Sequence, residues 1–209
     1  TSLKKNKFFK IKKNKQKILI EKYNLLINCE VKNFFTKKYF QNRLEKNYES
    51  YAHTTILEHK KMNNNRTALQ FFTKNGPLAF LPISASKTSI VYSARGSKNI
   101  DLKPLIKKYN LKYIIYKFNK ISNFKLNSLN LRNYHYKNIL AFGDLLHKLH
   151  PLAGQGFNMS IRDIRLLVDI IEFRLNRGLD LNYSVCKEFE KKTKHKNYIF
   201  SSGIDFIYE

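Results

Sequence analysis

The chain has 209 residues, of which 43% are hydrophobic, enough to build a core, so a disordered tail is excluded. Forty Lys and Arg residues against 15 Asp and Glu give a net charge of +25, which permits binding to nucleic acid or to an anionic membrane but establishes neither. The basic residues are spread along the chain without interleaved aromatic residues for base stacking, so we expect no nucleic-acid partner.

The cysteines and the distribution of apolar residues indicate the cellular compartment of the protein. Cys29 and Cys186 are far apart and form no C-x-x-C pair, so no disulfide framework or zinc site is indicated, and a reducing compartment is favoured. No apolar run reaches the roughly 18 residues that a membrane span requires, and no apolar core follows the basic start as in a signal peptide. We expect a cytoplasmic protein.

The first seventeen residues form a dense basic run that Phe8, Phe9 and Ile11 interrupt. We favour a solvated basic β-hairpin here, with a phosphate-binding arm or a membrane-surface contact as alternatives. Short apolar runs predict strands over residues 8–11, 17–21 and 23–28, and the last of these has the composition of a buried strand.

Residues 48–93 change to alternating β-branched and aromatic segments, which read YAHTTILEH, RTALQFF, GPLAFLPIS and TSIVYS. Asn, Gly and Ser turn signals separate them, so we predict an antiparallel sheet of about four strands. Pro77 and Pro82 make the third segment an edge or bulged strand. His53 and His59 have no partner at metal-ligand spacing, and we expect both to be core or surface histidines.

The second half of the chain alternates helices and strands. We predict a short helix over 101–110 and strands over 111–118, 124–129 and 139–142. A long helix then ends near Gly178, and a second helix runs from 182 to about 208. Apolar residues three or four apart predict which face of the first of these two helices is buried; they are Phe157, Ile161, Ile164, Val168, Ile171 and Leu175.

The most informative stretch is NILAFGDLLHKLHPLAGQGFNMSIRD, residues 138–163. A short apolar strand stops at Gly143, and a loop that Pro151 stiffens leads into the long helix. In open α/β sheets such a loop lies at the carboxyl end of the strand, where the following helix points free backbone N–H groups into a crevice. The alternative is a glycine-rich turn that only starts a helix.

Each residue type in this loop suits the binding of a polyhydroxy compound with a flat ring. Asp144 follows the strand, where a carboxylate can accept hydrogen bonds from sugar or polyol hydroxyls. Gly154 and Gly156 lack side chains, which allows the backbone to approach a flat ring. Gln155 and Asn158 add amides that donate or accept.

The ordered string G-D-x-x-H-x-x-H-P-x-A-G-Q-G-x-N-x-x-x-x-D, from Gly143 to Asp163, resembles the second FAD-binding motif of class A flavoprotein monooxygenases. Its H-P-x-A-G-Q-G-x-N portion is most similar to the ubiquinone-biosynthesis hydroxylases, as is the run F-T-x-x-G-P-L-A-x-L-P-I from Phe72 to Ile83. The resemblance implies a mixed α/β (α+β) fold: the C-terminal part of an FAD/NAD(P)-binding Rossmann-like domain with an inserted antiparallel-sheet substrate domain.

The resemblance also divides the chain into four segments: 1–46 in the FAD-binding domain, 47–130 as the substrate-binding sheet domain, 131–180 as the return to the FAD-binding domain, and 181–209 as a C-terminal helical region. The family's first βαβ unit, with its G-x-G-x-x-G phosphate loop, is not found. We therefore expect a C-terminal fragment, or a truncated copy, that is inactive and holds FAD poorly by itself.

The sheet of the substrate domain should wall off an apolar pocket. Phe71, Phe80, Leu81 and Tyr92 are candidate lining residues, although ordinary core packing is the favoured interpretation for each of them.

For the site itself, the resemblance implies FAD as cofactor, NAD(P)H as electron donor, and oxygen transfer from a flavin hydroperoxide to an aromatic ring. The flavin carries the chemistry, so no side chain is predicted as catalytic, but Pro151 and His150 should lie near its reactive face. His147 and His150 are expected to brace the loop rather than bind a metal, because no third ligand accompanies them.

The family's G-A-D-G signature corresponds here to residues 28–31, where Glu30 keeps the carboxylate and Val31 replaces the last glycine. The departure puts nicotinamide handling in doubt. The predicted cofactor-binding residues are Glu30, Gly143, Asp144, Pro151, Ala153, Gly154, Gln155, Gly156, Phe157 and Asn158.

We therefore interpret the chain as a fragment of an FAD-dependent, NAD(P)H-using aromatic-ring hydroxylase of ubiquinone biosynthesis, acting on a polyprenylated phenol or quinone precursor. Contact with the inner membrane surface or with a quinone-biosynthesis complex is part of this expectation. The alternatives are a related flavoprotein monooxygenase with another aromatic substrate, and a basic nucleic-acid-binding protein on a degenerate scaffold.

Overall fold

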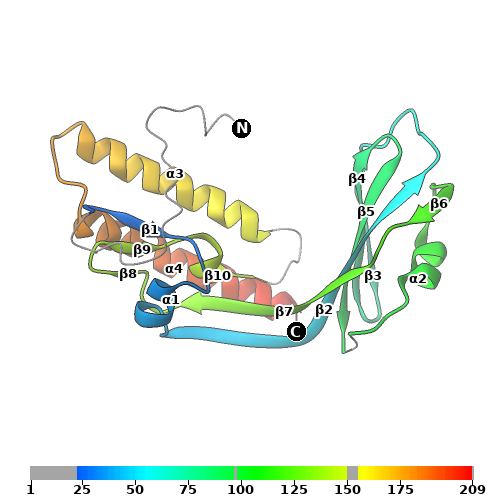
Figure 1. Ribbon diagram of the computed structural model, residues 1–209, viewed down its shortest axis with the longest axis horizontal. Helices are drawn as coiled ribbons and strands as arrows, with labels where there is room; N and C mark the ends of the chain where they lie inside the picture. Colours follow the sequence, from blue (N-terminus) through cyan, green and yellow to red (C-terminus); the bar gives the residue numbers. More distant parts are fainter. Residues whose placement is uncertain (1–22, 97, 150–154, 209) are drawn as a thin grey trace.

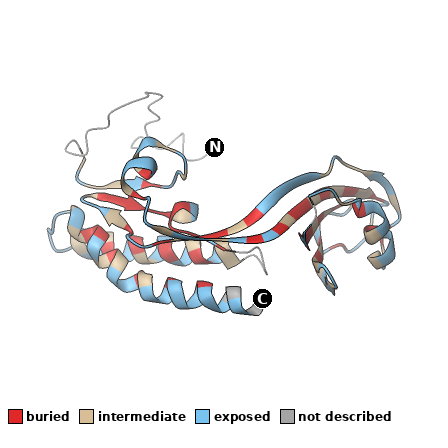
Figure 2. Cartoon of the chain, turned by 90° about the horizontal axis from the view of Figure 1, so that it is seen from below, coloured by how far each residue is buried: buried red, intermediate tan, exposed pale blue. Residues whose placement is uncertain are grey.

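A computed structural model describes residues 23–96, 98–149 and 155–208. In this part of the chain two bodies lie at the ends of a long two-stranded ribbon (Figure 1). One body holds a small sheet with the helices α3 (Gln155–Leu175) and α4 (Tyr183–Tyr208), and the other holds most of a larger antiparallel sheet with the helix α2 (Leu102–Tyr109). Figure 2 shows that buried residues gather in each body and alternate with exposed ones along the ribbon.

Within the described residues, the small sheet has three strands in the order β1-β9-β8, namely β1 (Leu26–Asn28), β9 (Ile139–Ala141) and β8 (His135–Tyr136). β1 and β9 run parallel although they are far apart in sequence. All three residues of β9 are fully buried in a core that also contains residues of α3 and α4. The predicted strand at 139–142 is confirmed, β1 is shorter than the predicted strand 23–28, and residues 8–11 and 17–21 lie outside the described part.

The larger sheet has the order β10-β7-β2-β5-β4-β3, and β6 also pairs with β2. The predicted strands of the 48–93 region are confirmed as antiparallel neighbours. Their bounds are β2 (Arg43–His59), β3 (Leu69–Thr73), β4 (Gly76–Ser84), β5 (Lys87–Arg95), β6 (Ile115–Phe118), β7 (Ser122–Leu131) and β10 (His147–Lys148).

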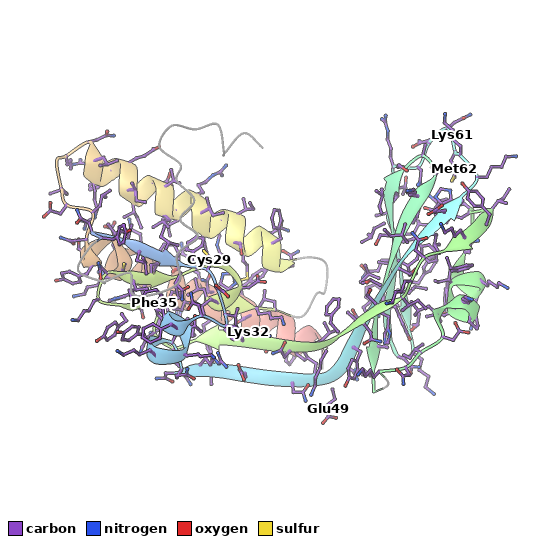
Figure 3. The ribbon with its side chains drawn as sticks, viewed as in Figure 1. Cys29, Lys32, Phe35, Glu49, Lys61 and Met62 are labelled. Atoms are coloured by element: carbon purple, nitrogen blue, oxygen red, sulfur yellow. The ribbon has the colours of Figure 1, made fainter. Side chains whose placement is uncertain are left out.

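β2 is longer than its sequence pattern predicts, because its polar first half pairs with β7. The register between the two strands shifts between Asn47 and Ser50, and Glu49 lies there with φ 50, in the left-handed region. Figure 3 places Glu49 at the bend of β2. The bulge redirects the strand, so β2 and β7 run from one body into the other, and the expected boundaries after residues 46 and 130 fall inside them.

The core of the second body explains the predicted helix at 101–110. α2 (Leu102–Tyr109) starts at Asp101, whose side chain accepts a hydrogen bond from the Lys103 backbone N–H at 3.0 Å. Its buried face, Leu102 and Ile106, packs against β4 and β5.

The candidate lining residues of the sheet divide between its two faces. Phe80 and Tyr92 are buried in the core against α2, and Phe71 packs partly against it. Leu81, the neighbour of Phe80, points to the other face of β4 and is 40% exposed. Three of the four therefore pack in the core.

The two predicted long helices are confirmed as α3 (Gln155–Leu175) and α4 (Tyr183–Tyr208), and Gly178 has φ 65 just beyond α3. The predicted buried face of α3 is wrong. Met159, Asp163, Leu167 and Ile170 are buried, and the predicted residues, apart from the half-buried Ile171, are exposed: Phe157, Ile161, Ile164, Val168 and Leu175. The helix carries two apolar stripes, and the sheet and α4 cover the one with Leu167 and Ile170.

Candidate cofactor-binding site

The candidate site begins where two parallel strands end at one edge of the small sheet. Asn28, the last residue of β1, lies opposite Ala141, the last residue of β9. The chain then turns at Gly143, whose φ of 63 favours glycine, into the short 3₁₀ helix η3 (Gly143–Leu145). Asp144 lies in this turn with an exposed side chain. Its carboxylate is therefore presented at the carboxyl edge of the sheet.

The turn after β1 is held by buried amides. Asn33 Nδ2 donates to Asn28 Oδ1 at 2.6 Å, and Asn28 Nδ2 donates to Thr36 Oγ1 at 2.9 Å. Asn33 also caps α1 (Phe34–Tyr39) by accepting from the Thr36 backbone N–H. These bonds fix the backbone between β1 and α1.

Glu30 lies in this turn, between Cys29 and Lys32, which are labelled in Figure 3, and its side chain is exposed. Because β1 and β9 are parallel neighbours, Glu30 and Asp144 follow strands that end at the same edge. The fold brings these two predicted site residues to one side of the sheet.

The start of α3 supplies four more of the predicted residues: Gln155, Gly156, Phe157 and Asn158. η3 and α3 contact each other. A Cβ built on Gly156 meets no atom within 4 Å in the described part of the chain, so the packing seen there does not require a glycine at this position. A glycine with no described atom near its Cβ position, in the first turn of a helix where backbone N–H groups lack partners within the helix, fits a flat anionic ring. His150, Pro151, Ala153 and Gly154 lie outside the described residues.

Within the motif, a buried His–Asp pair joins α3 to the larger sheet. His147 Nε2 of β10 donates to Asp163 Oδ2 of α3 at 2.8 Å, and both side chains are buried. Arg162 also donates to Asp163, at 3.1 Å, and Asn197 of α4 donates to it at 3.4 Å. Within the described ranges His147 Nδ1 has no hydrogen-bond partner. The expectation that His147 braces the loop had not included Asp163, although both stand in the motif.

Tyr134 extends this network. Its hydroxyl hydrogen-bonds Asn197, and burial raises the pKa of Tyr134 to about 12. The network therefore ties β10, α3, α4 and the segment before β8 together.

Among the described residues, no three His, Cys, Asp or Glu side chains gather in a way that could hold a metal ion. None of the helices described is long and apolar enough to span a bilayer.

Comparison with known proteins agrees with this geometry. A family model described as an FAD binding domain matches residues 102–179. The 3-demethoxyubiquinol 3-hydroxylase of Escherichia coli (strain K12) is 29% identical over 76% of this chain and 44% of its own length. The mitochondrial ubiquinone biosynthesis monooxygenase COQ6 of Schizosaccharomyces pombe is 25% identical over 87% of this chain and 48% of its own length. The chain thus spans less than half of each of these relatives.

Solved structures share the fold. The myxobacterial FAD-dependent halogenase CndH superposes with a TM-score of 0.66 and 15% identity, over 86% of this chain and 46% of that chain. pqsL, a probable FAD-dependent monooxygenase from Pseudomonas aeruginosa, superposes with a TM-score of 0.62 and 15% identity, over 87% of this chain and 53% of that chain. At these identities the likeness shows the fold alone, and it confirms the expected mixed α/β class. The chain thus carries a match to an FAD binding domain and is similar in sequence to ubiquinone hydroxylases and in fold to FAD-dependent monooxygenases and halogenases.

Proposed function

We propose that this chain is part of an FAD-dependent, NAD(P)H-using aromatic-ring hydroxylase of ubiquinone biosynthesis, with a polyprenylated phenol or quinone precursor as substrate. The observation that carries the proposal is the parallel pairing of β1 with β9, which presents Asp144 at the sheet edge in a turn, η3, that contacts α3. The substrate class comes from the relatives, whose names place them in ubiquinone metabolism.

Different residues of the chain would contact different parts of FAD. Asp144 accepts hydrogen bonds from the ribityl hydroxyls, a role suited to an exposed carboxylate at the end of a strand. The backbone N–H groups in the first turn of α3, which lack partners within the helix, would favour the electron-rich edge of the ring, and Gly156, which has no described atom near its Cβ position, would admit the ring. The bound flavin supplies the oxygen-transfer chemistry, and the protein orients it and excludes water.

Our proposal retains the remaining residues and segments predicted from the sequence. Pro151 and His150 are kept as residues that would lie near the reactive face of the flavin, Ala153 and Gly154 as further residues that would contact it, and Glu30 as a second carboxylate. The four domain segments expected from the sequence are kept, with the larger sheet as the wall of the substrate pocket. We place the protein in the cytoplasm, with a peripheral contact at the inner membrane surface or with a quinone-biosynthesis complex.

The test uses the full-length protein that contains this chain. We expect a flavin absorption spectrum after purification or FAD addition, and NADPH oxidation that a prenylated phenol stimulates, with a hydroxylated product seen by mass spectrometry. A flavin spectrum with stimulation only by non-prenylated aromatic compounds would favour the alternative monooxygenase with another substrate. A colourless protein that does not take up FAD would overturn the proposal.

A further inference from the structure

One face of α4 borders a cavity whose described lining contains no residue of the flavin motif. The cavity has a volume of about 720 Å³, and its walls come from α4, the ends of β2 and β7, and the segment that leads into β8. None of the described residues that line it belongs to the stretch 143–163 or to the turn that holds Glu30. It is therefore a site separate from the candidate cofactor site.

The floor of the cavity is apolar. Leu131 and Tyr134 are buried beneath it, and Leu44 of β2 contributes a side chain that is 41% exposed. Tyr198 of α4 adds a half-exposed aromatic ring at the wall. These side chains offer a surface for a hydrocarbon or aromatic group rather than for a bare ion.

The helical wall is basic because α4 places its charged residues on one stripe. Lys187, Lys191 and Lys194 recur at intervals of three or four residues and all line the cavity. Arg132 adds a fourth cation from the segment after β7.

A single carboxylate, Glu190, lies among the described residues that line the cavity. Lys194 Nζ donates to it at 2.8 Å, and the Tyr134 backbone N–H donates to its other oxygen at 3.3 Å. Arg132, Lys187 and Lys191 form no ion pair with a carboxylate in the described ranges of the chain. The cavity thus keeps three cations for an external anion.

We propose that this cavity binds a phosphate monoester carried on an apolar or aromatic body. A phosphate monoester carries a charge of about −1.5 to −2 at neutral pH, which matches several unpaired cations better than one carboxylate does. Arginine binds such a group through two parallel N–H donors of its guanidinium, and lysine binds it through the charge of its ammonium group. The volume lies within the range of about 300–1,000 Å³ that is typical of small-molecule sites.

The ligand could come from solution or from a membrane, and the probes distinguish these sources. Phenyl phosphate is the soluble phosphate monoester, inorganic phosphate lacks the apolar body, and phosphatidylcholine vesicles with or without phosphatidic acid present the same head group on a lipid. Isothermal titration calorimetry measures binding of the soluble probes to the full chain, and co-sedimentation measures its binding to the vesicles. Far-UV circular dichroism checks that each variant is folded.

Two variants of α4 make a matched pair. Lys191→Gln removes a cation from the cavity, and Lys196→Gln makes the same change at an exposed lysine that does not line it. We expect phenyl phosphate, or phosphatidic acid vesicles, to bind more tightly than inorganic phosphate or pure phosphatidylcholine. Lys191→Gln should weaken that binding about tenfold, the effect of losing one charge-assisted hydrogen bond, and Lys196→Gln should leave it unchanged.

The outcomes separate a built site from general attraction to a chain with a net charge of +25. Binding of phenyl phosphate that only Lys191→Gln weakens supports a soluble ligand, and the same pattern seen only on phosphatidic acid vesicles supports a lipid. Equal losses in both variants, equal binding of phenyl and inorganic phosphate, or no binding of either organic probe would overturn the proposal.

Discussion

Asp144 takes its position from the residue that precedes it. Gly143 turns the chain with φ 63 immediately after β9, and the next side chain is exposed at the sheet edge instead of entering the buried strand. A residue with a Cβ is disfavoured in that left-handed conformation, so the glycine and the carboxylate act together. The turn at Gly143 is therefore what places the Asp144 carboxylate at the sheet edge.

Replacing this carboxylate should weaken FAD binding without unfolding the protein. In the full-length protein we expect Asp144→Ala to raise the Kd for FAD about 10- to 100-fold, the effect of losing charge-assisted hydrogen bonds to hydroxyls. Asp169→Ala, at an exposed carboxylate on α3, is the control and should bind FAD normally. Flavin fluorescence titration measures both, and unchanged affinity in Asp144→Ala would remove the role given to this residue.

A second residue-scale effect concerns alkaline pH. Burial raises the pKa of the Cys186 thiol from 9.0 to about 12. Between these values the unfolded chain loses the thiol proton while the folded chain keeps it, so this group makes the free energy of unfolding fall as pH rises above 9.0. Below that pH it has no such effect.

Removing the thiol should therefore change the slope of stability against pH. We expect the free energy of unfolding of Cys186→Ala to fall less steeply above pH 9.0, by up to about 1.4 kcal/mol per pH unit. Urea unfolding at several pH values on both sides of 9.0 measures this difference. Parallel curves for the two proteins would contradict the buried, neutral thiol.

Among the secondary-structure elements, the hairpin of β3 and β4 depends on one glycine. Gly76 has φ 138, and a Cβ built there would lie 1.8 Å from the backbone oxygen of Ser93 in β5. The close approach brings the turn against β5: the Arg95 backbone N–H donates to the Asn75 carbonyl at 2.9 Å, and β4 pairs with β5 from Leu78 onward. The Thr73 hydroxyl donates to the Gly76 carbonyl at 2.7 Å and closes the same turn.

We expect Gly76→Ala to lower the free energy of unfolding by at least about 3 kcal/mol, because both the conformation and the contact exclude a side chain. Gly203→Ala is the matched control: it lies in α4 with no atom of the described chain within 4 Å of the added carbon. Better helix propensity should make that variant more stable by about 0.5–1 kcal/mol. Equal effects of the two substitutions in urea unfolding would be inconsistent with this hairpin geometry.

The described part of the molecule has two large, separate cores besides two small buried clusters. One contains the small sheet with residues of α3 and α4, and the other contains residues of β2, β4 and β5 together with α2. The two clusters share no buried residue in the described part of the chain, and the ribbon of β2 and β7 joins them (Figure 1). Local stability can therefore differ between the two bodies.

Core truncations should act on one body at a time. Phe80→Ala in the second core and Phe189→Ala in the first each remove a side chain that is at most 1% exposed, at a cost of about 3–5 kcal/mol. In hydrogen exchange we expect Phe80→Ala to lower the protection of β3, β4, β5 and α2, and Phe189→Ala to lower that of β1, β9 and α4. Loss of protection throughout the chain in either variant would show a single cooperative unit.

The sequence by itself determined the elements that depend on neighbouring residues. Periodicity located the strands β2 to β5 and the helices α2, α3 and α4, because a repeat of two or of three to four reflects local backbone geometry. The sequence also predicted the turn at Gly143, since the preference of glycine for turns is a local property of the chain.

Only the tertiary structure decided which surfaces of these elements meet. α3 carries two apolar stripes, and the sheet with α4 covers the one with Leu167, leaving the predicted stripe with Ile161 exposed. β2 extends through a polar segment because β7, distant in sequence, supplies its hydrogen bonds. The His147–Asp163 pair and the basic cavity beside α4 likewise join residues from separate elements. The physical reason is that burial and long-range pairing depend on contacts between segments far apart in the chain, which local spacing does not encode.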